Sequence, residues 1–150
     1  MTDVAVICVG NRTRSDDAVG PVIADELQAR GLRVPIYVTG GEPAELLDLW
    51  ADLDRVVVVD AVLTGRQKPG TVHVMSATDS PLHLGSQAST HGIGLAESIE
   101  LARSLNQLPA EVQLVGVEAT DLAPGTELSP AVQAAVPEAV ATVIAEVGDA

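Results

Sequence analysis

Two continuous runs of apolar residues limit the folds that this chain can adopt. The first is VAVICV at 4–9 and the second is RVVVVDAV at 55–62. Runs without alternating polar residues are typical of strands covered on both faces, as in parallel sheets. β-branched residues dominate the second run, which favours a strand over a helix. We therefore expect a central sheet with helices packed on both of its faces.

The rest of the chain alternates between strand and helix patterns. Apolar residues at helical spacing predict helices over 21–31, 43–53, 91–106 and 129–148, and further strands are expected over 34–39, 71–76 and 111–118. Too few residues separate Asp60 from the strand at 71–76 for a helical crossover, so this strand should be antiparallel or lie at an edge. The pattern predicts an α/β fold, a three-layer αβα sandwich around a mostly parallel, twisted sheet of about five strands, as a single domain over residues 1–150.

The last predicted helix carries its own boundary signals. Ser129 is a candidate N-cap, Pro130 suits the first helical position, and Gly148 suits the end. Pro137 lies inside the pattern and is expected to kink the helix.

Composition narrows the classes of function. The net charge of −13 argues against binding to nucleic acid or to an anionic membrane, because both require basic patches. No secretory signal and no apolar run of membrane-spanning length is seen, so we expect a cytoplasmic protein with no membrane insertion. The single cysteine, Cys8, lies within an apolar strand and is interpreted as a small buried hydrophobic residue. With no Phe, one Trp and one Tyr, the core should be mainly aliphatic.

Acidic and glycine residues follow the predicted strands at one end. Asp16 and Asp17 follow the first strand, Gly40 and Gly41 follow the second, and Asp60 ends the third. In an open α/β sheet, ligands bind outside the carboxyl ends of the strands, near the point where strand order reverses. The loop that ends at the glycine-flanked His91, in STHGIGL, could fold over the same edge.

A nucleotide site does not fit these residues. The segment GNRTRSDDAVG matches neither G-x-G-x-x-G nor the P-loop pattern, and its acids would repel a phosphate. Gathered carboxylates need a cation or a shared proton, and an added imidazole makes a divalent metal site a natural hypothesis. Simpler roles remain open: Asp16 is better interpreted as a helix cap, Asp60 could bind a nearby backbone N–H, and His73 and His83 are interpreted as ordinary side chains.

In combination, these segments resemble one known family over nearly the whole chain. The matching pieces are CVGNRTRSDDAVG, TGGEPAELL, VVVVDAVLTGRQKPGTV, STHGIGLAESIELA, VQLVGVE and LSPAV, in that order. They resemble the hydrogenase maturation endopeptidases, nickel-dependent proteases that trim the large subunit of NiFe hydrogenases.

The resemblance implies an activity and a set of residues. It implies an endopeptidase that removes the C-terminal extension of a nickel-loaded NiFe hydrogenase large subunit precursor, with the nickel supplied by the substrate. Asp17, Asp60 and His91 would be the nickel ligands and the catalytic residues. Asn11 and the pair Gly40 and Gly41 are the candidate substrate-binding residues.

Some positions depart from the family pattern and leave alternatives open. Thr39 stands where an Asp usually precedes the Gly-Gly pair, and Glu42 stands where a threonine usually follows it. Glu42 is a candidate to supply the missing carboxylate. A non-catalytic, metal-dependent chaperone of the same large subunit is the main alternative function. A receiver-like signalling domain is a weaker one, because the segment VQLVGVEATD lacks the lysine that such domains need.

Overall fold

The computed structural model describes residues 3–13, 15–78, 95–120, 124–125 and 127–148. Strands and helices alternate along the chain as the apolar pattern predicts. The elements are β1 (Val4–Val9), the 3-10 turn η1 (Ser15–Ala18), α1 (Val19–Ala29), β2 (Ile36–Thr39), α2 (Pro43–Trp50), β3 (Arg55–Val62), β4 (Val72–Ser76), α3 (Leu95–Ser104), β5 (Glu111–Glu118) and α4 (Pro130–Val147).

The strands form one sheet in the order β2-β1-β3-β5-β4. All neighbouring pairs are parallel except β4 with β5, so the prediction of an antiparallel or edge strand at 71–76 is confirmed. From β1 the chain moves outward to β2 and then crosses back to β3 on the other side of β1. Strand order therefore reverses between β1 and β3, which is where ligands bind in sheets of this kind.

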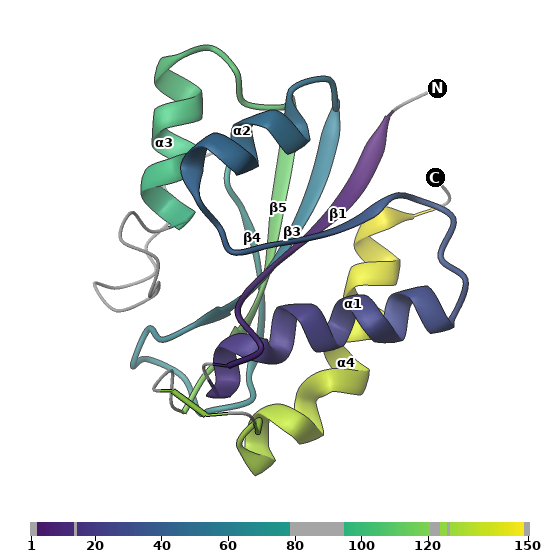
Figure 1. Ribbon diagram of the computed structural model, residues 1–150, viewed down its shortest axis with the longest axis vertical. Coiled ribbons are helices and arrows are strands. Elements are labelled where there is room, and N and C mark those ends of the chain that lie inside the picture. Colours follow the sequence, from purple (N-terminus) through teal and green to yellow (C-terminus); the bar gives the residue numbers. More distant parts are fainter. Residues whose placement is uncertain (1–2, 14, 79–94, 121–123, 126, 149–150) are drawn as a thin grey trace.

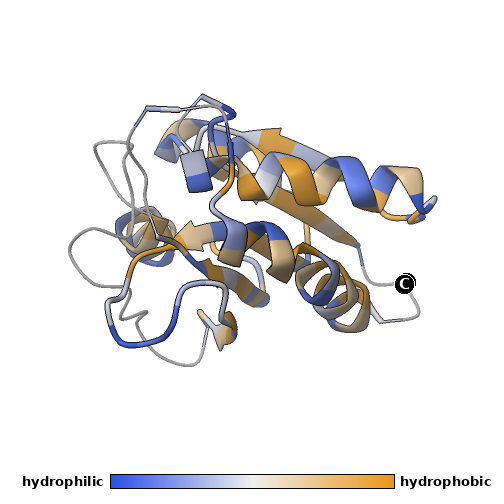
Figure 2. Ribbon diagram, turned by 90° about the horizontal axis from the view of Figure 1, so that it is seen from below, coloured by the Kyte–Doolittle hydropathy of each residue, from blue (hydrophilic) through white to orange (hydrophobic). Residues whose placement is uncertain are grey.

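Helices cover both faces of the sheet and make the predicted three layers (Figure 1). Helices α1 and α4 pack on one face and α2 and α3 on the other, and successive residues of β1 and β3 point alternately into the two cores. Figure 2 shows hydrophobic residues along the strands between the helical layers. Both cores are aliphatic except for the fully buried Trp50, as expected from the composition.

The helix boundaries follow the predicted signals with small differences. Helix α1 begins two residues earlier than predicted, with Pro21 still in its first turn, where a missing N–H removes no helical hydrogen bond. Ser129, Pro130 and Gly148 occupy the N-cap, first and C-cap positions of α4, and the helix continues through Pro137. The predicted start of α3 at 91–94 lies outside the described residues.

Contrary to the expectation that no apolar run reaches membrane-spanning length, helix α4 is long and apolar enough to cross a membrane by length and composition alone, with a mean hydropathy of 1.2. However, one side of α4 packs in the core against α1 and the sheet. The buried side chains there include those of Val132, Val136, Val140 and Val143. Core helices of water-soluble folds share this composition. The structure therefore explains the hydropathy of α4 by packing.

Candidate functional site

Asp17 is held at the end of β1 by close backbone packing. The Asn11 N–H donates a hydrogen bond of 3.1 Å to the Asp17 carbonyl oxygen. A Cβ atom at Gly10 would lie 2.0 Å from that same oxygen, and one at Gly20 would lie 2.2 Å from the Val9 carbonyl oxygen. Only glycine allows the backbones to approach so closely. The chain therefore folds back over the end of β1 and buries Asp17, which is 3% exposed.

Asp60 lies near the carboxyl end of β3, between β1 and β5. Its side chain is 3% exposed, and Gly116 is its neighbour in β5. Burial raises the pKa of Asp60 well above its ordinary value, and the negative charge of Asp17 raises it further, while a hydrogen bond from the Ala61 backbone acts in the opposite direction. The structure thus brings Asp17 and Asp60 into electrostatic contact at the point where strand order reverses.

The third predicted ligand, His91, lies outside the described residues. Within the parts of the chain that are described, no three His, Cys, Asp or Glu side chains are grouped closely enough to hold a metal ion. What the structure provides is two buried carboxylates that oppose each other's ionisation. Such a pair is suited to accept either a proton or a cation with further ligands of its own.

Asp16 has a different role from its neighbour. Its carboxylate accepts hydrogen bonds from the Thr120 N–H at 2.8 Å, the Ser129 N–H at 2.6 Å and the Ser129 hydroxyl at 3.0 Å. The predicted cap on the following helix is wrong, because the N-cap residue of α1 is Ala18, with no side-chain capping bond. Asp16 instead joins the end of β5 to the start of α4. The Ser129 hydroxyl serves this contact and makes no capping bond to its own helix.

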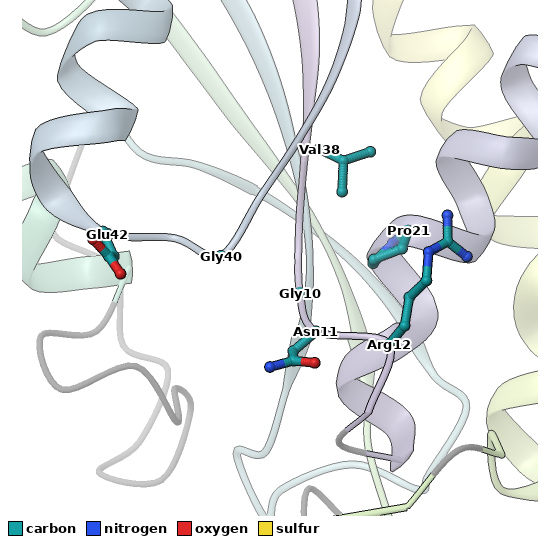
Figure 3. A pocket seen from close by; sticks show the side chains of 7 residues that line it. All are labelled: Gly10, Asn11, Arg12, Pro21, Val38, Gly40 and Glu42. Atoms are coloured by element: carbon teal, nitrogen blue, oxygen red, sulfur yellow. The ribbon is translucent and has the colours of Figure 1, made fainter.

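Two of the predicted substrate-binding residues line an open cleft of about 490 Å³. Its lining is formed by Gly10, Asn11, Arg12, Pro21, Val38, Gly40 and Glu42. Figure 3 shows these residues around the turn after β1, with Glu42 on the side of α2 and Pro21 on the side of α1. The Asn11 side-chain oxygen accepts bonds from the Thr13 N–H and hydroxyl, at 2.9 and 2.6 Å, which shape this turn.

Gly41, the third predicted substrate-binding residue, is buried beside the cleft. Its φ of 91° lies in the left-handed region that favours glycine. Its N–H donates to the Thr39 hydroxyl at 3.2 Å, and that hydroxyl in turn donates to Glu45. The carboxylate that contacts Thr39 is therefore that of Glu45, on α2. Glu42 lines the cleft instead, and its role as a replacement for the missing family carboxylate stays a prediction.

A buried carboxylate at the end of β5 was missed by the sequence reasoning. Glu118 is 1% exposed and accepts bonds from the Thr64 N–H and hydroxyl, the Gly65 N–H and the His73 imidazole. It therefore secures the chain that leaves β3 shortly after Asp60. Its position as a strand-end acid was a usable signal, the same one that identified Asp60. His73, interpreted as an ordinary side chain, is this carboxylate's partner.

Cys8 behaves as the sequence predicts. It is fully buried in β1, and burial, with a smaller effect of Asp25, raises the pKa of its thiol to about 12. A thiol in this state is not a nucleophile at neutral pH. The site chemistry must therefore come from the carboxylates and the loops around them.

The fold and the residues at the carboxyl ends of its strands define a class of protein. It is an α/β domain with buried carboxylates at the point where strand order reverses, where nucleotide-binding proteins of similar architecture have a phosphate-binding loop. The family model for hydrogenase maturation proteases (HycI) matches residues 21–146. The chain therefore belongs to the hydrogenase maturation protease family, whose members hydrolyse peptide bonds. This membership excludes the receiver-like alternative.

Individual relatives agree with this assignment. The chain is 31% identical to the hydrogenase 2 maturation protease of Escherichia coli K12 over 146 residues, covering 95% of this chain and 88% of the relative. Among solved structures, the hydrogenase maturating endopeptidase HybD from E. coli superposes with a TM-score of 0.81 at 29% identity, covering 96% of this chain and 91% of that one. The NiFe hydrogenase maturation protease HybD from Thermococcus kodakarensis gives 0.71 at 25% identity, covering 93% and 95%.

Proposed function

We propose that this chain is an endopeptidase that removes the C-terminal extension of a NiFe hydrogenase large subunit precursor after that precursor has received its nickel. Family membership supports the protease activity, and the printed names of the relatives support a hydrogenase precursor as substrate. We also propose that the protein recognises the nickel bound to the precursor. The observation that supports this is the buried pair of Asp17 and Asp60, in which Asp17 raises the pKa of Asp60.

The nickel belongs to the substrate in this proposal. Two carboxylates and the His91 imidazole would complete the coordination shell of an ion that the precursor already holds. A docked divalent ion can polarise the scissile carbonyl or acidify a bound water. The chain's own residues position the ion: the turn after β1 fixes Asp17, and the centre of the sheet fixes Asp60. Neither a serine nor a cysteine nucleophile is required.

The cellular setting follows from the same proposal. The acidic surface and the buried, unreactive Cys8 suit a cytoplasmic enzyme whose partner is another folded protein. The expectation that nucleic acid is not a partner rests on the net charge of −13.

A non-catalytic chaperone of the same subunit is the second candidate function. The observation in its favour is Thr39, whose hydroxyl is engaged by Gly41 and Glu45 at a position where the family usually carries an acid. If that acid were needed for cleavage, this chain would bind its partner without cutting it.

A cleavage assay tests the proposal against the chaperone. We expect the wild-type chain to shorten a nickel-loaded precursor, and Asp17→Asn and Asp60→Asn to reduce the rate by about a hundredfold or more, since positioning a Lewis acid is worth several kcal/mol. Asp52→Asn is the matched control, because Asp52 is an exposed aspartate in the turn before β3, at the opposite end of that strand from Asp60. Binding of the precursor without any shortening by the wild-type chain would favour the chaperone.

A further inference from the structure

The sheet has an open edge beside the candidate site. Strand β2 is the terminal strand in the order β2-β1-β3-β5-β4, so within the described residues only β1 pairs with it. Two of its four residues, Tyr37 and Val38, are large hydrophobic side chains that are substantially exposed, Val38 at 48%. Open apolar strand edges are the surfaces on which extended peptides add as a further strand.

The hydrogen-bonding groups of that edge can be assigned from the pairing with β1. The carbonyl oxygens of Pro35 and Thr39 accept bonds from the N–H groups of Val6, in β1, and of Gly10, just after β1, each at 2.9 Å. Alternate residues of a strand direct their backbone groups to opposite sides, so those of Ile36 and Val38 face away from β1. A segment lying along β2 would meet an N–H and a C=O from each of these residues.

The edge leads directly into the cleft and towards the acid pair. Val38 and Gly40 line the cleft on the β2 side, and Gly10 and Asn11 line it on the β1 side. Gly10 and Asn11 are also the residues whose backbone contacts the Asp17 carbonyl oxygen. The floor of the cleft and the backbone that carries Asp17 are therefore one continuous piece of chain, and Figure 3 shows Val38 on the side of Pro21.

We propose that the open edge of β2 binds the precursor polypeptide as an added strand, with backbone groups paired to Ile36 and Val38 and an apolar side chain packed in the cleft against Val38 and Pro21. This inference rests on the proposed function and identifies where that substrate docks. The net charge of −13 disfavours an acidic segment, so the bound segment is neutral or basic.

A proline substitution tests the edge, with a matched control on the opposite edge of the sheet. Val38→Pro removes an N–H that faces away from β1, which an edge strand tolerates. Val74→Pro is the control, because Val74 lies on β4 and is 47% exposed. Thr71 and Ala77, each three residues from Val74, bond to β5, and backbone groups alternate along a strand, so those of Val74 face away from β5. With a nickel-loaded large subunit precursor from the same organism, Val38→Pro should raise KM about tenfold with little change in kcat, and Val74→Pro should change neither.

Backbone amide exchange gives a second readout on the wild-type chain. A synthetic peptide spanning the cleavage region of the precursor should slow exchange at Ile36 and Val38 and leave Val74 unchanged. This measurement stands even if the chain cleaves nothing, so failure of docking can be told apart from failure of the proposed function. Wild-type KM in Val38→Pro, or unchanged exchange at Ile36 and Val38, would overturn the proposal. So would a self-association of the chain that Val38→Pro abolishes, since a second copy would then occupy the edge.

Discussion

Two adjacent aspartates in the turn after β1 have different roles. Among the described residues, Asp16 accepts hydrogen bonds from Thr120 and Ser129, so its carboxylate joins the end of β5 to the start of α4. Asp17 is buried near Asp60, and its negative charge adds to the effect of burial in raising the pKa of Asp60. Burying opposed carboxylates is a cost that a structural role does not explain, and it is typical of functional sites.

Replacing Asp16 should destabilise the protein. Asp16→Ala removes a fully buried carboxylate and leaves the Thr120 and Ser129 N–H groups without this acceptor, and we expect a loss of about 2–4 kcal/mol in the free energy of unfolding. Asp25→Ala is the control, because its exposed ion pair with Arg12 should contribute less than about 1 kcal/mol. Urea denaturation measures both, and equal effects of the two changes would contradict the structural role of Asp16.

Replacing Asp60 should change how stability depends on pH. The pKa of Asp60 is raised in the folded chain, whereas an unfolded aspartate titrates near about 3.9. As pH rises above that value the unfolded state releases its proton first, so the free energy of unfolding falls until the folded pKa is passed. Asp60→Asn removes this loss. In chelator-treated protein, the free energy of unfolding of Asp60→Asn should exceed that of the wild type by an amount that grows as pH rises from the unfolded to the folded pKa of Asp60. A difference that does not depend on pH would contradict the account.

At the scale of elements, close backbone contacts place the site. Helix α1 packs against the end of β1 through Gly20, and the turn between them closes through Gly10. These contacts determine where η1, and with it Asp17, lies relative to β3. A single added methyl group is therefore expected to disturb the geometry of the acid pair.

Gly20→Ala should be destabilising, because its Cβ would lie 2.2 Å from the Val9 carbonyl oxygen and the backbone must move to relieve the clash. We expect a cost of about 1–3 kcal/mol, as for overpacking in a core. Gly40→Ala is the matched control, since a Cβ at Gly40 meets no atom within 4 Å. Thermal unfolding checks both, and a wild-type melting temperature for Gly20→Ala would show that the helix is not held this closely.

The sequence predicts some of these elements well and others poorly, for physical reasons. The strands at 4–9 and 55–62 are found with the predicted bounds, because a strand buried on both faces is a nearly continuous apolar run. Asp17 and Asp60 are predictable because strand ends meet at one edge. The partners of Asp16 lie 104 and 113 residues further along the chain, and the contact of His73 with Glu118 needs the pairing of β4 with β5. Local patterns carry no information on such long-range contacts.

At the scale of the whole molecule, a mostly parallel sheet presents the buried Asp17 and Asp60 at the carboxyl ends of its strands, with the terminal strand β2 beside them. The role of His91 stays a prediction, since it lies outside the described residues, and the proposed nickel contact depends on it. Within the described residues, the acid pair alone does not make a metal site. In the proposed function the ion arrives with the substrate, and His91 and groups of the precursor provide the remaining ligands.

Cleavage of one precursor with and without nickel tests this central claim most directly. The same large subunit precursor is prepared nickel-loaded and nickel-free, and shortening is followed on a gel with the wild-type chain and with His91→Ala. The account predicts that only the nickel-loaded precursor is shortened and that His91→Ala shortens neither form while keeping the wild-type melting temperature, because a ligand at an open site contributes little to the core. Equal shortening of the nickel-loaded and nickel-free precursors by the wild-type chain would contradict it.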